Sequence, residues 1–225
     1  MFSWLIDAWF PPTCAGCGSE GQWICRVCMI RFQPMHDRCF GCRRPSGNGR
    51  FCFLCARAWP VVGVTAAGSY TEPVVRDTIH AMKYRYARIL CSALAPFLES
   101  AIYLHGDAPH DPILVPLPLS RRRYTWRGFN QAALLAEGAG SRAGWPVAHV
   151  LTRVRHTFPQ AELSHEERHA NVAGAFRVQD RFSFEGRDVI LIDDVATTGS
   201  TLRAAAEACR TAAAGNVYAS VIAIG

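Results

Sequence analysis

This chain of 225 residues lacks long apolar runs and an N-terminal basic segment, and it has very little lysine. No stretch of about 18 apolar residues occurs, which excludes a membrane-spanning helix. The apolar N-terminus carries Asp7 and has no basic residue before Arg26, so a signal peptide is not expected and we predict a cytoplasmic protein. Charged residues make up 19% of the chain and hydrophobic ones 50%, which excludes wholesale disorder.

Lys83 is the single lysine of the chain, and arginine supplies the other 23 of its 24 Lys and Arg residues. Such a composition retains a lysine where a compact point charge serves better than the planar fork of arginine. Chance survival explains it equally well, so both interpretations stay open. The formal charge of +6 suggests a polyanionic partner. That argument weakens if cysteine thiolates bind zinc, because most of the positive excess then disappears.

Ten cysteines are present, and disulfides do not account for them in a cytoplasmic protein. Cys91 and Cys209 stand in helix-like patterns and are interpreted as small core thiols. The other eight fall within the first 55 residues and form four Cys-x-x-Cys pairs. The first and second pairs are separated by seven residues, and the third and fourth by nine. The segment is therefore an internal repeat of two units.

Two such pairs supply the four soft ligands that Zn²⁺ takes in a tetrahedron. We predict two structural zinc sites with the pairs joined in sequence, 14/17 with 25/28 and 39/42 with 52/55; an interleaved cross-brace is the alternative. A redox role is disfavoured, because a redox pair would be single and attached to a thioredoxin-like unit. Full coordination by sulfur also leaves no open position for catalysis. The predicted ligands are the paired cysteines, Cys14, Cys17, Cys25, Cys28, Cys39, Cys42, Cys52 and Cys55.

Composition changes near Pro60, which predicts a double zinc ribbon in residues 1–59 and a second domain in residues 60–225. In the second part, strand-like aliphatic runs alternate with helix-like stretches. Strands are predicted at 61–70, 113–117, 147–154, 174–178, 189–192 and 217–224, and helices at 74–83, 87–104, 129–142 and 201–214. This alternation is typical of an α/β, Rossmann-like fold, a mostly parallel sheet with helices on both faces.

The most specific motif runs from Val189 to Thr201 and reads Val-Ile-Leu-Ile-Asp-Asp-Val-Ala-Thr-Thr-Gly-Ser-Thr. Four aliphatic residues predict a buried strand, and Asp193 and Asp194 follow at its carboxyl end, where α/β sheets bind ligands. The residues after them lead into an alanine-rich helix, so their amides and hydroxyls predict an anion cradle. Gly199 permits close approach of a phosphate, and the two acids suit sugar hydroxyls or hydrated Mg²⁺. A solvated Asp-Asp turn before a capped helix is the structural alternative.

These residues resemble the signature with which type I phosphoribosyltransferases bind 5-phosphoribosyl 1-pyrophosphate (PRPP). The resemblance implies that Asp193 and Asp194 contact the ribose hydroxyls and that the loop after them binds the 5′-phosphate. The residues that it assigns to this loop and its approach are Val195, Ala196, Thr197, Thr198, Gly199, Ser200 and Thr201.

A closer resemblance covers essentially the whole chain in the same order. The residues that carry it are Val115-Pro-Leu-Pro118, Arg127-Gly-Phe-Asn-Gln131, and Arg153-x-Arg155-x-Thr157-x-Pro159-Gln160 with Leu163, Arg168, Asn171 and Phe176. Together with the cysteine pairs they resemble the ComF family. That family is associated with competence and natural transformation, and it joins a double zinc ribbon to a phosphoribosyltransferase-like domain. One departure is Arg43, where a zinc knuckle often has glycine, and it leaves the turn type of the second unit open.

Cations for the 1′-pyrophosphate of PRPP have three candidate sources. Lys83 follows the first helix, the turn around Pro116 precedes three arginines at 121–123, and Arg153 begins a polar stretch that ends at Arg168. By resemblance, this stretch is the flexible loop that closes over PRPP. For the turn and its arginines, a solvated basic loop is the alternative.

Three functional hypotheses follow. The protein binds PRPP or a related phosphorylated ribose and acts in the uptake and handling of single-stranded DNA, with other competence proteins as partners; here the resemblance implies the DNA role. Alternatively, it is an active phosphoribosyltransferase with an unidentified acceptor unrelated to DNA uptake. Mg²⁺ would then accompany PRPP, and Asp193, Asp194 and Lys83 would be the catalytic residues. The third hypothesis is a scaffold held together by zinc.

Aromatic residues are interleaved with the arginines of residues 121–127. Tyr124 and Trp126 stand in this cluster, and an alternation of basic and aromatic side chains suits single-stranded nucleic acid. Packing of both rings under the loop is the other interpretation.

Overall fold

The computed structural model describes residues 11–84, 87–106, 111–154, 174–179, 182 and 184–225. The loop predicted to close over PRPP, after Arg153, lies mostly outside these residues. None of the described helices is long and apolar enough to cross a membrane.

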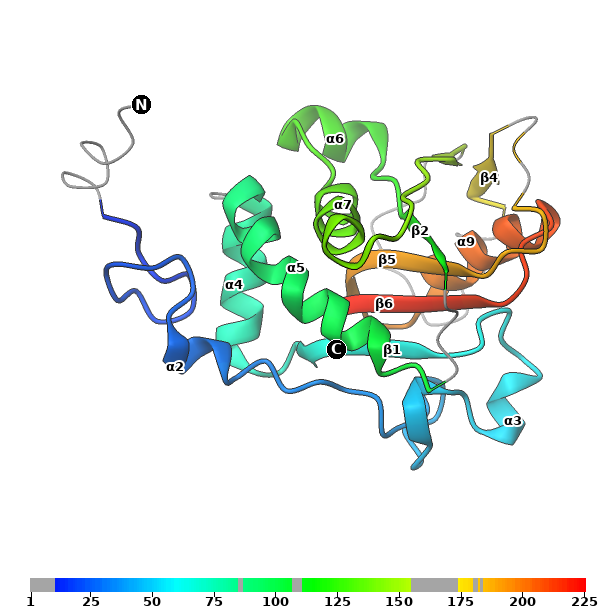
Figure 1. The fold of residues 1–225 in the computed structure, drawn as a ribbon, viewed down its shortest axis with the longest axis horizontal. Coiled ribbons are helices and arrows are strands. Elements are labelled where there is room, and N and C mark those ends of the chain that lie inside the picture. The colour runs from blue at the N-terminus through cyan, green and yellow to red at the C-terminus, as the bar shows by residue number, and fades with distance from the viewer. Residues whose placement is uncertain (1–10, 85–86, 107–110, 155–173, 180–181, 183) are drawn as a thin grey trace.

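A four-stranded parallel sheet forms the centre of the molecule (Figure 1). Its strands, in spatial order, are β1 (Val64–Ser69), β6 (Val217–Ile224), β5 (Val189–Ala196) and β2 (Ile113–Pro116). β6 is buried at every position, and its apolar run is the pattern of a central strand covered on both faces. The predicted fold class is therefore confirmed.

Helices cover both faces of this sheet. One face carries α4 (Pro73–Tyr84), α5 (Ala87–Tyr103) and α7 (Gln131–Ala143), and the other carries α9 (Ser200–Thr211) (Figure 1). Side chains alternate along β5 with the period of two that a strand imposes. Ile190 and Ile192 join the core under α4, α5 and α7, whereas Val189 and Leu191 join the core under α9. Cys91 and Cys209 are buried in these two cores, as predicted.

The two cysteine units lie at opposite ends of edge strand β1 (Figure 1). The first contains α2 (Arg26–Met29) and joins the core under α4 and α5. The second contains the 3₁₀ turn η1 (Gly47–Gly49) and α3 (Phe53–Ala56), and joins the core under α9. Between them, Met35 pairs with Ala66 of β1 in an antiparallel bridge. The division of the chain near Pro60 stays a prediction.

Three predicted elements differ from the structure. The segment predicted as one strand at 147–154 contains only β3 (Leu151–Arg153), paired with β4 (Phe176–Val178), and a bridge from Val147 to Leu114. β5 continues to Ala196, four residues beyond its predicted end. The interpretation of residues 121–123 as a solvated loop is wrong, because they begin helix α6 (Arg121–Arg127). The Ser120 hydroxyl caps that helix by accepting from the Arg123 amide.

Candidate functional site

The two neighbouring acids occupy opposite faces of the sheet. Because β5 extends through them, Asp193 continues the row of Val189 and Leu191, and Asp194 continues the row of Ile190. Asp194 is buried and Asp193 is half-buried. The pair therefore consists of one carboxylate directed to the α4 and α7 side and one directed to the α9 side.

Both carboxylate oxygens of Asp194 are bound by other side chains. The Lys83 ammonium group lies 3.0 Å from Oδ1, and the Gln131 side-chain amide donates to Oδ2 at 2.5 Å. Lys83 comes from the last turn of α4, and Gln131 is the first residue of α7. The structure thus places Lys83 beside the acids. Sequence reasoning missed Gln131 as a site residue, although the Arg-Gly-Phe-Asn-Gln motif contained it.

Asp193 has a raised pKa, about 7, mainly because burial disfavours its charge and because Asp194 lies next to it. Its Oδ1 accepts from the Asp194 amide at 2.8 Å. The positive charges of Lys83 and Arg123 partly offset the shift. Burial and the positive charge of Arg123 lower the pKa of Arg153, and the nearby Asp193 partly offsets that shift. The Arg153 guanidinium lies over the Phe176 ring. Arg123 and Arg153 therefore act electrostatically on the acidic end of β5.

The loop after β5 turns sharply into α9. Gly199 is the N-cap of α9 and has a φ of 71°, a left-handed conformation that favours glycine. The Thr198 and Ser200 hydroxyls lie 3.1 Å apart. Within the described part of the chain, the amides of Thr198 and Gly199 have no backbone acceptor. Amides of this kind at the start of a helix can bind an anion, so the local geometry fits the predicted cradle.

The turn after β2 lies next to this strand. Pro116 pairs with Ile192, and the Leu117 amide donates to the Ile192 carbonyl oxygen at 2.9 Å. Asn130 holds the same turn from the other side, because its side-chain amide donates to the Leu117 carbonyl oxygen at 3.0 Å. Its Oδ1 also accepts from the Ala132 amide and so caps α7. The turn, the acids and the loop before α9 are therefore at one edge of the sheet.

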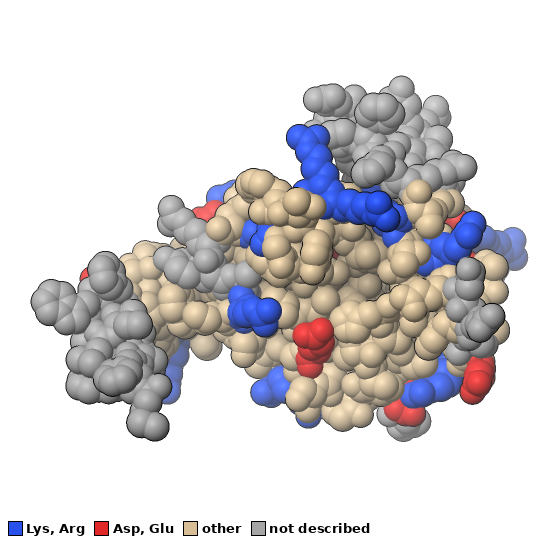
Figure 2. Space-filling view, turned by 90° about the horizontal axis from the view of Figure 1, so that it is seen from above, with Lys and Arg blue, Asp and Glu red and all other residues tan. Residues whose placement is uncertain are grey.

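Exposed aromatic and basic side chains lie over α6 and the end of α4. Tyr124 is 53% exposed and Trp126 69%, so the interpretation that both pack under a loop is wrong. The Trp126 ring makes an edge contact with Tyr84, with 5.4 Å between centroids. The Arg127 guanidinium lies over the Tyr84 ring, 5.4 Å from its centroid. Seen from above, Lys and Arg side chains gather in a band on this side of the molecule (Figure 2).

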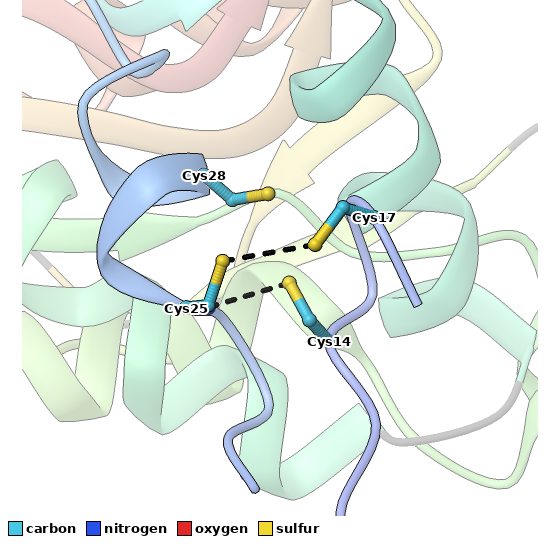
Figure 3. A group of neighbouring side chains, drawn as sticks. All are labelled: Cys14, Cys17, Cys25 and Cys28. Carbon is cyan, nitrogen blue, oxygen red and sulfur yellow. Dashed lines mark hydrogen bonds between the residues drawn. The ribbon is translucent and has the colours of Figure 1, made fainter. Parts of the chain in front are cut away.

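The eight paired cysteines form two groups of four, Cys14/17/25/28 and Cys39/42/52/55, which is the predicted sequential pairing. Within each group all sulfur atoms lie within 4.8 Å of one another. Between the two Cys-x-x-Cys pairs of each unit, the sulfur atoms of Cys17 and Cys25 lie 3.7 Å apart and those of Cys42 and Cys52 lie 3.6 Å apart. A tetrahedron with Zn–S bonds of about 2.3 Å has edges of about 3.8 Å. Both groups therefore fit a structural ion such as zinc, and the sulfur atoms of the first point toward a common centre (Figure 3).

Hydrogen bonds around the sulfur atoms favour thiolates, the form that binds metal. Hydrogen bonds with Ser19 lower the pKa of Cys17 to about 6. A backbone hydrogen bond with Cys55 lowers the pKa of Cys52 to about 7, and burial raises the pKa of Cys55 to about 12. Burial also raises the pKa of Cys28 in the first group. Each group thus combines a thiol of lowered pKa with one whose thiolate is disfavoured by burial and would be stabilised by a cation.

Both units have the same knuckle turn, although the second has no glycine in it. Gly18 has a φ of 76° and Arg43 a φ of 60°, so Arg43 adopts the conformation that glycine takes in the first unit. Each residue donates its amide to the carbonyl oxygen of the first cysteine, Cys14 or Cys39, at 2.8 Å. The turn type that Arg43 left open is therefore the same in the two units.

No family model matches the chain. The DNA utilization protein YhgH of Salmonella typhi is 31% identical, with 80% of each chain covered. Competence protein F of Haemophilus influenzae is 30% identical, with 85% of this chain and 75% of that protein covered.

The chain belongs to the ComF family. Competence protein ComFC of Bacillus subtilis is likewise 30% identical to this ComF-family protein, with 86% of each chain covered. Two solved structures are similar at lower identity. The protein TT1426 from Thermus thermophilus is 18% identical, with 62% of this chain and 74% of that chain covered and a TM-score of 0.36. A hypoxanthine phosphoribosyltransferase from Staphylococcus aureus is 14% identical, with 60% of each chain covered and a TM-score of 0.33.

Proposed function

We propose that this protein binds PRPP, or a related phosphorylated ribose, together with Mg²⁺, and that it acts in the handling of single-stranded DNA during competence. The observation that supports the ligand is the shared edge of the sheet where Asp193, Asp194 and Lys83 meet a loop that caps α9 with Gly199. The names of the relatives, DNA utilization and competence proteins, support the process.

In this proposal the sugar phosphate lies along the carboxyl end of β5. The amides and hydroxyls of residues 197–201 bind the 5′-phosphate at the start of α9. Asp193 accepts from the ribose hydroxyls, and Asp194 orients Lys83 toward the pyrophosphate. Arg153 and the turn at Pro116 would meet the same pyrophosphate, and their proximity to the acids supports this role.

Mg²⁺ fits this site through Asp193. Mg²⁺ is usually held by one or two carboxylates together with phosphate oxygens and water. Asp193 is half-buried, and its raised pKa of about 7 means that a nearby cation would favour its ionised form. When bound, the ion would neutralise pyrophosphate charge. Asp194 is less suited to hold it, because both its oxygens already have partners.

Titration calorimetry with PRPP and Mg²⁺ tests the ligand. We expect the wild type to bind PRPP only with Mg²⁺, and Asp193→Asn and Lys83→Met each to weaken binding at least about tenfold. Asp111→Asn is the control, because Asp111 precedes β2 at the opposite edge of the sheet and pairs with Arg187 there. Absence of PRPP binding by the wild type would refute the proposed ligand.

Turnover is tested separately, by release of pyrophosphate from PRPP in the presence of nucleobases, nucleosides or oligonucleotides. Release with an acceptor unrelated to DNA would favour the alternative hypothesis, an active phosphoribosyltransferase outside DNA uptake. Binding without release would support a protein that senses or holds a phosphorylated sugar.

The first turn of α6 supports the nucleic-acid partner. Three arginines occupy the positive end of that helix, with no acid among them, although cations are disfavoured there. An anionic partner would relieve this conflict. The exposed edge-to-face pair of Tyr84 and Trp126 beside Arg127 offers rings on which bases can stack.

Fluorescence anisotropy with single-stranded oligonucleotides tests this partner. Affinity should fall steeply with salt and drop when the arginines at 121–123 are replaced by glutamine. Trp126→Ala should weaken binding about five- to a hundredfold, as for one lost stacking contact. Tyr103→Ala is the control, because Tyr103 is a similarly exposed ring that contacts Trp145. Salt-independent affinity, or equal loss in the control, would contradict the proposal.

A further inference from the structure

The second cysteine unit lies directly against the loop before α9. A Cβ placed on Gly199 would approach Phe40 Cε1 at 2.5 Å and Trp59 Cη2 at 2.7 Å. Real Cβ atoms do not come so close, so the two rings leave room only for glycine. The loop is therefore in contact with the N-terminal unit at the very residue where the chain turns into the helix.

The same rings are built into the metal site. Phe40 stands between ligands Cys39 and Cys42, and a Cβ on Gly41 would lie 3.1 Å from Cys55 Sγ and 3.2 Å from Trp59 Nε1. Trp59 stacks on Phe51 with 4.9 Å between centroids and meets Phe40 edge-on at 5.7 Å. Phe51 immediately precedes a third ligand. An aromatic cluster of Phe40, Phe51 and Trp59 thus connects the four sulfur atoms to the loop.

A second link joins the unit to the strand that leads into the loop. The Arg43 guanidinium donates to the Gly225 carbonyl oxygen at 2.7 Å. The Gly225 amide in turn donates to the Ala196 carbonyl oxygen at 2.9 Å, next to the first residue of the loop. Arg43 belongs to the knuckle turn after Cys42, so its position depends on the geometry of that turn.

The first unit has no comparable contact in the described part of the chain. A Cβ on Gly16 would approach Val74 in the first turn of α4, and Phe32 packs on Phe97 of α5 at 4.9 Å. Both contacts lie on the face of the sheet that α4, α5 and α7 cover, opposite the face that α9 covers. The two cysteine units are alike in sequence and turn, but they contact different parts of the α/β core.

We infer that the second cysteine unit positions the loop at residues 197–201, with Phe40 and Trp59 as the positioning residues. Metal bound by that unit then holds this loop in the conformation that binds phosphate. The ordering of the loop follows from the contacts alone. Its consequence for PRPP affinity rests on the proposed function. A loop fixed before binding loses less conformational freedom when the ligand arrives, which increases affinity.

Two matched cysteine variants test the inference. Cys42 and Cys17 are exposed ligands at the same place in the two units. Each change to serine should lower the zinc content by about one ion per chain. Cys42→Ser should speed amide hydrogen exchange in residues 197–201 and weaken PRPP binding about tenfold or more, within the usual range of coupling between sites. Cys17→Ser should leave both unchanged, so equal effects in the two variants would overturn the inference.

Variants of Trp59 keep the test sharp if loss of a ligand unfolds the second unit. Trp59 is half-buried and lines a shallow hollow of about 430 Å³ together with Arg57, Arg203 and Arg210, so a smaller side chain does not leave a closed cavity. Trp59→Ala should keep two zinc ions and yet increase exchange of the loop. Trp59→Phe should restore slow exchange, because it keeps a ring above Gly199.

A spectroscopic readout separates positioning from general stability. In protein labelled with 5-fluorotryptophan, the resonance that disappears in Trp59→Phe belongs to Trp59. It should shift when PRPP binds and should shift in the same sense with saturating inorganic phosphate. No shift despite tight PRPP binding would refute the inference. If the wild type binds no PRPP, the proposed ligand fails, and the exchange of residues 197–201 in Cys42→Ser still decides whether the unit orders the loop.

Discussion

Lys83, the only lysine of the chain, forms an ion pair with Asp194, with 3.0 Å between Nζ and Oδ1. Their side chains are 16% and 8% exposed. A carboxylate with so little water around it requires a partner, because an unpaired buried charge is costly. The Gln131 amide occupies the other oxygen, Oδ2. The Lys83 ammonium group can meet Oδ1 as a compact point charge, whereas a planar guanidinium would need more room.

Removing the ammonium group should therefore destabilise the fold. We expect Lys83→Met to lower the free energy of unfolding by about 2 kcal/mol, less than for a fully buried pair because Lys83 keeps some contact with water. Lys83→Met combined with Asp194→Asn should cost clearly less than the sum of the single changes. Urea unfolding of the four proteins measures this coupling, and additive losses would show that the ion pair contributes nothing.

Arg43 offers a separate test of backbone conformation. At a φ of 60° any side chain is strained, whereas glycine is not. Arg43→Ala and Arg43→Gly both lose the hydrogen bond to Gly225 and the contact with Phe40, so the difference between them isolates the backbone. We expect the glycine variant to be more stable than the alanine variant by about 1 kcal/mol, measured by urea unfolding at a fixed zinc concentration.

Local patterns in the sequence were sufficient for much of the architecture. The aliphatic run at 217–224 predicted β6 with its observed bounds, and the cysteine spacing predicted the two groups of four. The strand, acids and glycine of residues 189–201 predicted a strand, a loop and a helix in that order. Each of these features depends on residues close together in the chain, where spacing and hydrophobic period determine the outcome.

Features that depend on distant residues could not be predicted in this way. Gln131 meets Asp194 only because α7 packs beside β5, and no local pattern indicates that contact. Trp59 meets Gly199 across most of the chain length. Helix α6 was missed for a different reason: three arginines in a first turn are unfavourable with the helix dipole, and they read as a loop despite Ser120 and Gly128 at its ends.

Stability should increase with pH through the titration of His105. This residue is buried, with Nε2 near the Thr65 and Ser220 hydroxyls, and burial lowers its pKa to about 4 from the usual 6.5. The unfolded chain therefore binds more protons between these values, so the free energy of unfolding should rise as pH goes from about 4 to 6.5, by at most about 3 kcal/mol. In His105→Asn this slope should be reduced. Equal slopes for the two proteins in zinc-containing buffers would contradict the assignment.

Asp193 should act in the opposite direction. Its pKa is raised from 3.8 to about 7 in the folded protein, so the fold favours the neutral carboxyl. The native state binds more protons between those values, and this group's contribution to stability is lost as pH rises through the window. Asp193→Asn keeps the shape without the charge, and it should be more stable than the wild type by about 1–2 kcal/mol at pH 8 and by less at pH 5. Urea midpoints at the two pH values measure the difference. A wild type that is more stable than Asp193→Asn at pH 8 would contradict the prediction.

Gly199 should tolerate no side chain, for two independent reasons that a matched pair of variants can separate. Gly199 and Gly144 have φ values of 71° and 74°, so alanine is similarly strained at both positions. Only at Gly199 would the new Cβ also meet the rings of Phe40 and Trp59, because nothing lies within 4 Å of a Cβ on Gly144. We expect Gly144→Ala to lower the free energy of unfolding by about 1 kcal/mol, and Gly199→Ala to lower it by a further 1–3 kcal/mol, approximately the cost of overpacking. Combining Gly199→Ala with Trp59→Phe should recover part of that excess, since the smaller ring leaves space for the methyl group. Equal losses at the two glycines would mean that the rings move aside easily, and the contact between the second cysteine unit and the loop would then be too soft to position that loop.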